Sequence, residues 1–302
     1  MIELERDGID TELTPPISIA RPAIQSIPLV FCSPHSGRVY PRAFLQASRL
    51  SPLVLRRSED AFVDRLFASA VGHGAPLLSA LFPRAYLDVN REPLELDPRL
   101  IDGPMPSAAN TQSARVAGGL GTIPRLVADG EDIYASRMPV AVALQRIERL
   151  YHPFHQALAG LMRDTHRNFG TALLVDCHSM PSTSVGNTPS QRPHFVIGDR
   201  FGTSCAPEIT RVVCRNLTAM GHDVHVNRPY AGGFITEHYG QPHARMHAIQ
   251  IEINRSLYLD EAALEPKADF YRFAAVIESL VAALAVFSGT WVRPNPFRSA
   301  AE

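Results

Sequence analysis

The sequence predicts an α/β fold, a single domain in which a mainly parallel or mixed sheet is flanked by helices. Short apolar segments, typical of buried strands, alternate with longer segments whose apolar residues recur every three or four positions. This alternation is typical of parallel strands that helices cover on both faces. With 302 residues, 45% of them hydrophobic, the chain is long enough to enclose a sizeable core.

The individual elements follow from these patterns in chain order. Residues 1–27 contain Thr14-Pro15-Pro16 and Arg21-Pro22, which favours an extended arm, so we expect the single folded domain to comprise residues 28–302. The predicted strands cover residues 29–33, 76–78, 86–89, 173–177, 194–197, 224–226 and 248–254. The predicted helices cover residues 60–71, 139–168, 207–220 and 267–287. Residues 92–130 are rich in Pro and Gly and predict a long loop, which is commonly functional.

Charge and composition exclude several classes of protein. The 29 basic and 30 acidic residues nearly balance and form no basic block, so nucleic acid is not an expected partner. The apolar stretch 273–287 is interrupted by Glu278 and is shorter than the ~20 residues of a membrane-spanning helix, so no membrane association is expected. The N-terminus is acidic and lacks an apolar signal region, and the four cysteines form no pairing motif. We therefore expect a cytoplasmic protein with reduced thiols.

Two predicted strands deliver a histidine at the same relative place, His35 after the first and His178 after a later one. Ligands of open α/β sheets bind beyond the carboxyl ends of the strands, so the two imidazoles are expected to converge there. The acidic pair Glu59-Asp60 offers a carboxylate for the same rim. Two histidines and one carboxylate are typical of a catalytic zinc site, although either histidine alone is more often structural.

A second carboxylate is predicted on the polar face of a strand. Residues 249–254 alternate isoleucine with polar residues, which places Glu252 on the face opposite the isoleucines. Burial of an unpaired carboxylate is costly, so Glu252 is expected to face a metal or a cation, or to have a catalytic role. The alternative is a solvated face of an edge strand. Asp176 shares a strand face with His178 and is a candidate to orient that ring, or to cap a turn.

Other catalytic chemistries have weaker support. Cys177 and His178 are adjacent in a strand and point to opposite faces, so they cannot form a thiolate pair, although Cys32 on a neighbouring strand remains a rival partner. The serines lack a nucleophile elbow, and no glycine motif for phosphate is present. Arg84 and Asn90-Arg91 bracket a short predicted strand and suit an acidic substrate at a pocket rim, or ordinary surface ion pairs.

Taken together and in this order, six motifs between residues 28 and 260 resemble the N-formylglutamate amidohydrolase family, which is distantly similar to zinc carboxypeptidases and aspartoacylases. The motifs are Ser-Pro-His35-Ser-Gly, Glu-Asp60, Asp88-Val-Asn90-Arg91, Asp176-Cys-His178-Ser, Gly232-Gly233-Phe-Ile-Thr236-Glu-His238-Tyr-Gly240 and Gln-Ile-Glu252-Ile-Asn-Arg. The resemblance implies a phosphorylase/hydrolase-like fold and one zinc ion. The metal ligands that it implies are His35, Asp60 and His178. The implied catalytic residues are Glu252 and Arg84, and the implied substrate-binding residues are Asn90, Arg91, Gly233, Thr236 and His238.

The sequence departs from the relatives at one position. They usually have a glutamate three residues after the first histidine, where this chain has Arg38. The carboxylate ligand is therefore expected from Asp60, with Glu59 as the substitute.

The resemblance implies a zinc-dependent amidohydrolase that cleaves the N-formyl group of N-formyl-L-glutamate, giving formate and L-glutamate, within histidine breakdown. The expected partner is thus a small-molecule N-acyl amino acid. Two alternatives stay open. One is a metal-dependent deacylase or peptidase for another N-acyl amino acid or peptide, and the other is a carboxylate-binding protein without catalysis.

Overall fold

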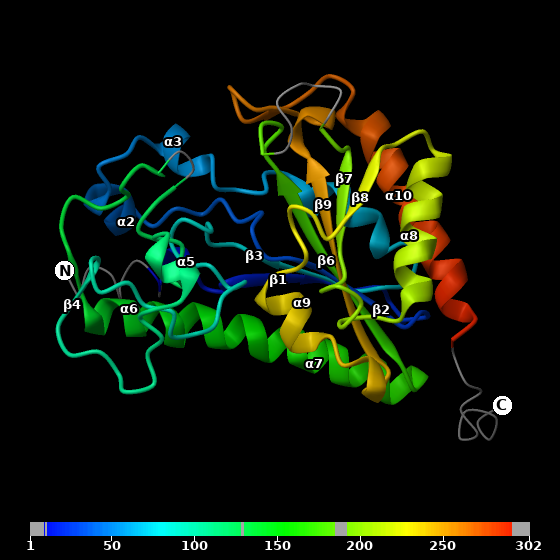
Figure 1. Ribbon diagram of the computed structural model, residues 1–302, viewed down its shortest axis with the longest axis horizontal. Coiled ribbons are helices and arrows are strands. Elements are labelled where there is room, and N and C mark those ends of the chain that lie inside the picture. The colour runs from blue at the N-terminus through cyan, green and yellow to red at the C-terminus, as the bar shows by residue number, and fades with distance from the viewer. Residues whose placement is uncertain (1–8, 10, 128–129, 185–191, 292–302) are drawn as a thin grey trace.

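A computed structural model describes residues 9, 11–127, 130–184 and 192–291. The main strands are β1 (Ile17–Ala20), β2 (Leu29–Ser33), β3 (Leu77–Ala80), β6 (Ala172–Met180), β7 (Phe195–Gly198), β8 (Val224–Val226) and β9 (Met246–Asn254). They form one sheet of seven strands in the order β1-β3-β2-β6-β9-β7-β8 (Figure 1). β1 pairs with β3 and β7 with β9 in antiparallel fashion, and the other neighbours are parallel. The predicted mixed, mainly parallel sheet is confirmed.

Helices cover both faces of this sheet. The helices of the described residues are α2 (Arg42–Ala47), α3 (Pro52–Arg56), α4 (Val63–Leu66), α5 (Ala114–Ala117), α6 (Val140–Arg146), α7 (His152–Phe169), α8 (Pro207–Ala219), α9 (Phe234–Tyr239) and α10 (Phe270–Gly289). One core cluster packs α6, α7 and α9 against one face, and the other packs α4, α8 and α10 against the opposite face (Figure 1). Alternate residues of β2 enter different clusters, Val30 the first and Phe31 the second, as expected for a strand buried on both faces.

Short elements complete the chain. Two small two-stranded sheets pair β4 (Ile101–Asp102) with β5 (Met138–Pro139), and β10 (Leu259–Asp260) with β11 (Glu265–Pro266). Short 3-10 turns lie at Ala68–Ala70, Pro242–Ala244 and Arg255–Leu257.

The long helix predicted over 139–168 is present with an irregular centre. α6 and α7 are joined by a π-helical turn at Ile147–Tyr151, directly before Pro153, which lacks the N–H for a regular α-helical bond. Gly170 ends the helix in the left-handed conformation, with φ of 70°, and β6 follows directly. The predicted end of the helix at this glycine is therefore confirmed.

The structure corrects three local predictions. Residues 86–89 form no strand, because the N–H groups of Tyr86 and Leu87 both donate to the Pro83 carbonyl in a turn. The helix predicted over 60–71 is divided into α4 and the 3-10 turn at Ala68–Ala70. Within the predicted arm 1–27, Ile17–Ala20 is strand β1, which pairs with β3 at the edge of the sheet.

The C-terminal helix is longer than the apolar stretch suggested. α10 has 20 residues, and among the described helices it is the one long and apolar enough to span a membrane by those two criteria alone. Its residues Phe273, Ile277 and Leu280 are buried in the second core cluster.

Candidate metal centre

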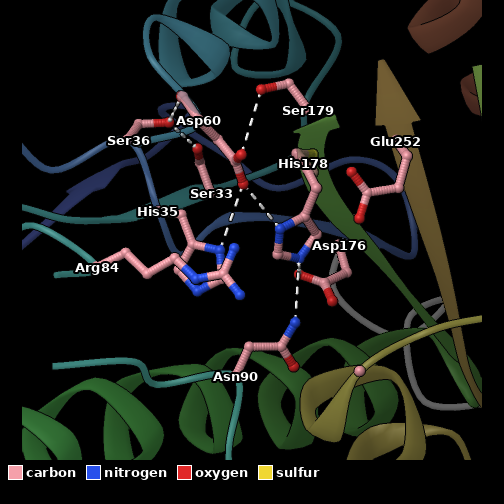
Figure 2. A network of polar contacts seen from close by, with 12 residues as sticks. Ser33, His35, Ser36, Asp60, Arg84, Asn90, Asp176, His178, Ser179 and Glu252 are labelled. Atoms are coloured by element: carbon pink, nitrogen blue, oxygen red, sulfur yellow. Dashed lines mark hydrogen bonds and ion pairs between the residues drawn. The ribbon is translucent and has the colours of Figure 1, made fainter. Parts of the chain in front are cut away.

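Three side chains from separate parts of the chain meet at the carboxyl end of the central strands. His35 follows β2, His178 lies near the end of β6, and Asp60 precedes α4, with its N–H bonded to the His35 carbonyl. Their ligand atoms all lie within 4.8 Å of one another. Asp60 Oδ2 is 3.3 Å from His35 Nδ1 and 2.9 Å from His178 Nδ1. Figure 2 shows both rings turned toward this oxygen.

Each imidazole also faces a second carboxylate with its other nitrogen. His35 Nε2 is 2.8 Å from Asp88 Oδ1, and His178 Nε2 is 2.9 Å from Asp176 Oδ1. Histidine ligands of metals commonly donate their second N–H to a carboxylate, which fixes the ring and its tautomer. Asp88 stands in this relation to His35. Asp176 Oδ1 lies beside His178, as considered from the sequence, but makes no hydrogen bond within the described residues, and the hydrogen-bond partner of His178 Nε2 is the Asn90 side-chain amide at 3.3 Å.

The donor set fits a divalent cation such as zinc. His35 Nδ1 is buried and has no hydrogen-bond partner within the described part of the chain. Asp60 Oδ1 accepts from Ser179 Oγ and from Arg255 Nη2, both at 3.2 Å, which leaves Oδ2 facing the imidazoles. Burial by itself would raise the pKa of Asp60, but the hydrogen bond with His178 and the charge of both histidines hold that pKa well below its usual range. Two imidazole nitrogens and one ionised carboxylate are a typical catalytic zinc set.

The other candidate carboxylate is directed elsewhere. Glu59 accepts a hydrogen bond from the Tyr40 hydroxyl at 2.7 Å and one from Arg56 Nε at 3.3 Å. Arg38, the residue three positions after His35, is 3.5 Å from Asp64. The structure thus places Asp60, and not Glu59, beside the two imidazoles.

Glu252 lies beside this cluster on β9, in parallel register with His178 on β6 (Figure 2). It is 7% exposed, and β9 lies between β6 and β7, so the alternative of a solvated edge strand is wrong. Gln250 Nε2 donates a hydrogen bond of 2.8 Å to Glu252 Oε1 and fixes the carboxylate. Burial raises the pKa of Glu252 to about 7, which is suitable for a group that accepts and returns a proton near neutral pH.

A cavity of about 490 Å³ opens on these groups. Its lining includes the three candidate ligands and Glu252, and it carries more cationic than anionic side chains. The carboxylates are Asp60, Asp88 and Glu252, and the guanidinium groups are Arg57, Arg84, Arg91, Arg115 and Arg255. Such an excess of positive charge in a concave site favours an anionic ligand.

Some of the predicted catalytic and substrate-binding residues line this cavity. Arg84 donates from Nε to Asp88 Oδ2 at 3.0 Å, and its guanidinium lies beside His35 (Figure 2). Asn90 lines the same cavity, and its Oδ1 accepts from the N–H of Ile235 at 2.8 Å. Gly233 lies against Asn90 so closely that any Cβ at this position would overlap the Asn90 amide.

The remaining predicted residues have other contacts. Arg91 lines the cavity, but it donates Nε to the Leu120 carbonyl and Nη1 to the Asn90 carbonyl, both at 2.8 Å. Thr236 is buried behind the site, with its hydroxyl 3.3 Å from Asp176 Oδ2. His238 is exposed on α9 and stacks on Phe234. Neither Thr236 nor His238 is among the residues that line the cavity.

Three further residues of the site were not proposed from the sequence. Gln250 shares the polar face of β9 with Glu252, so strand alternation was an available signal. Arg255 follows the same strand and bonds to Asp60. Arg115 lies on the short helix α5, within the segment predicted as a long loop, where no periodicity indicated the direction of its side chain.

Known proteins are similar to this chain in sequence. The family model for N-formylglutamate amidohydrolase matches residues 27–259. N-formylglutamate deformylase of Pseudomonas aeruginosa is 31% identical over 243 residues, which cover 78% of this chain and 84% of that protein. The Pseudomonas putida protein of the same name is 28% identical, over 78% and 83% of the two chains.

A solved structure agrees with these matches. The crystal structure of N-formylglutamate amidohydrolase from Ralstonia eutropha JMP134 superimposes with a TM-score of 0.87 and 34% identity, covering 92% of this chain and 99% of that one. The chain belongs to the N-formylglutamate amidohydrolase family.

Proposed function

We propose that the protein is a zinc-dependent deformylase that hydrolyses N-formyl-L-glutamate to formate and L-glutamate. The observation that carries the proposal is the buried His35–Asp60–His178 group, which opens with Glu252 into an arginine-lined cavity. The relatives named for this activity support the substrate. The four cysteines are free thiols, which agrees with a cytoplasmic enzyme.

His35, Asp60 and His178 would hold the ion, which when bound supplies Lewis acidity and lowers the pKa of water. Glu252 accepts a proton from the water that attacks the formyl carbon. As the carbon–nitrogen bond breaks, Glu252 returns the proton to the leaving nitrogen, so formate and the free amine are the products. Gln250 keeps the carboxylate in place during both transfers.

Arg84 is the proposed donor to the formyl oxygen. Its Nε is held by Asp88, so the guanidinium is fixed beside His35 before a substrate arrives. A donor that is already in place where negative charge develops lowers the activation barrier by on the order of 3 to 4 kcal/mol.

Asn90 and Arg91 are the proposed contacts for the α-carboxylate, next to the backbone of Gly233. Arg91 uses Nε and Nη1 within the protein, so Nη2, which lies 3.4 Å from Asp88 Oδ2, is the part that would reach a ligand.

Formate release from N-formylglutamate tests the proposal. We expect turnover by the purified protein, loss of turnover after treatment with a chelator, and recovery when zinc is added back. The Glu252→Gln variant serves as the matched control, because it removes the proton acceptor and leaves the three ligands in place. Absence of formate release from a folded, zinc-loaded protein would refute the proposed function.

A further inference from the structure

The five cavity arginines differ in how much of each guanidinium the protein already uses. Arg255 is fully engaged, since Nε donates to Ser179 Oγ at 3.2 Å, Nη1 to the Arg57 carbonyl at 2.9 Å and Nη2 to Asp60 Oδ1 at 3.2 Å. Arg91 donates two of its nitrogens to backbone carbonyls. These two arginines therefore hold the walls of the cavity together more than they offer a free binding surface.

Arg115 has a different environment. Its guanidinium makes no hydrogen bond within the described residues, and its ion-pair contact there is Nη1 to Glu95 Oε2 at 3.8 Å. The side chain is 35% exposed, whereas that of Glu95 is 5% exposed. The buried Glu95 carboxylate therefore attracts the Arg115 guanidinium, whose N–H groups stay available to a ligand in the cavity.

The backbone that carries Arg115 is held firmly. The Ser113 side chain caps the start of α5 by accepting from the Val116 N–H at 3.1 Å. Arg99 Nη2 donates to the carbonyls of Val116 and Ala117 at the end of α5, both at 2.8 Å. A guanidinium on such a fixed support loses little freedom when it binds, which favours recognition of a planar carboxylate.

Arg115 also lies near the proposed α-carboxylate contacts. Burial lowers the pKa of Arg91 to about 10, and the charge of Arg115 contributes to that shift, so the two groups are within electrostatic reach. Arg91 joins the Leu120 carbonyl, in the same loop as Arg115, to Asp88 beside the metal ligands. One residue thus connects the loop of Arg115 to the catalytic centre.

We propose that Arg115 binds the side-chain carboxylate of the substrate and makes the enzyme select acidic N-formyl amino acids. The inference rests on the proposed function. A substrate with two carboxylates needs a second cationic contact beyond Asn90 and Arg91, and Arg84 lies at the carbonyl end of the cavity beside His35. Arg115 is a cavity guanidinium with an open face and a rigid support.

The test compares kcat/KM for N-formylglutamate with that for N-formylglutamine, which has the same shape without the second charge. In Arg115→Gln we expect the value for N-formylglutamate to fall by about 10- to 100-fold, the range of a lost charge-assisted hydrogen bond. The value for N-formylglutamine should stay within about twofold. Arg115→Lys should be intermediate, because it keeps the charge and loses the planar fork.

Two matched variants define the outcome. Arg211→Gln removes an exposed arginine on α8, outside the cavity, and should leave both substrates unaffected. Arg57→Gln removes another cavity arginine and should retain the preference for N-formylglutamate. Thermal melting and zinc content show that each variant is folded and loaded.

Two results from the variants would overturn the inference alone. One is an unchanged preference in Arg115→Gln, whether or not both activities fall, and the other is a preference that disappears in Arg57→Gln instead. A wild-type enzyme that releases formate from both substrates equally well also excludes selection by Arg115. If the folded wild-type protein releases no formate from N-formylglutamate, the proposed function fails and the inference fails with it.

Discussion

The stability of the protein is expected to fall in mild acid because of one partly buried histidine, His155 on α7. Its Nε2 donates to the Val89 carbonyl at 2.9 Å, and its Nδ1 is 3.0 Å from the Tyr239 hydroxyl. The ring is enclosed by aromatic side chains, with the Tyr151 ring centre at 4.3 Å. Burial lowers the pKa of His155 from its ordinary 6.5 to about 4, so the native state keeps the ring neutral where the unfolded chain protonates it.

The size of the effect follows from this shift. The pKa of His155 is lower in the folded than in the unfolded chain. The contribution of the neutral ring to the free energy of unfolding is therefore complete above pH 6.5 and is lost as the pH falls toward 4. The difference between 6.5 and about 4, at about 1.4 kcal/mol per pH unit, gives a full loss of about 3.5 kcal/mol, of which about 3 kcal/mol is reached at pH 4. The carboxylates with lowered pKa values, such as Asp88, contribute at lower pH and are present in all variants.

Urea unfolding at pH 7.5 and pH 4 measures this loss. In His155→Gln, whose amide keeps a donor for the Val89 carbonyl, the decrease in unfolding free energy should be smaller than in wild type by up to about 3 kcal/mol. His152→Gln is the matched control, because that ring is 47% exposed on the same helix and its replacement should leave the decrease unchanged. Equal decreases in wild type and His155→Gln would refute the reasoning.

Three further outcomes concern the site. Glu252→Gln should lower kcat by about 10²- to 10⁴-fold with zinc content unchanged, and near-normal turnover would remove Glu252 from the mechanism. Gly233→Ala places a methyl group against Asn90 and should raise KM for N-formylglutamate more than it lowers kcat, as steady-state kinetics will show. Asp88→Asn should weaken zinc binding by about 10- to 100-fold in competition with a chromophoric chelator, whereas undiminished affinity would contradict a role for Asp88 in holding His35.

The meeting of His35 and His178 was predictable because β2 and β6 are buried parallel strands, and parallel strands bring their carboxyl ends to one edge. The direction of Glu252 was predictable from alternation along β9. Both predictions depend only on the geometry of regular strands, and the pattern of apolar and polar residues indicates where such strands lie.

Other parts depend on contacts that no local pattern contains. Tyr86 and Leu87 are buried because the turn at Pro83 folds them into the core, and the same apolar residues in sequence look like a strand. Thr236 and His238 lie two residues apart in one motif. On helix α9 such residues point to different sides, so Thr236 is buried and His238 is exposed. Arg115 reaches the cavity through a loop whose path is set by Arg91 and Arg99.

The separation of the two imidazoles in the chain has a consequence for biosynthesis. His35 follows β2, the first strand of the parallel core, whereas His178 is in place only when β6 has been made and has paired with β2. A nascent chain that has not yet reached β6 offers only one of the two ligand imidazoles to the cation that we propose. Uptake of the proposed zinc ion would therefore follow assembly of the central strands, and the zinc-to-protein ratio of a purified sample would measure the fraction that has matured.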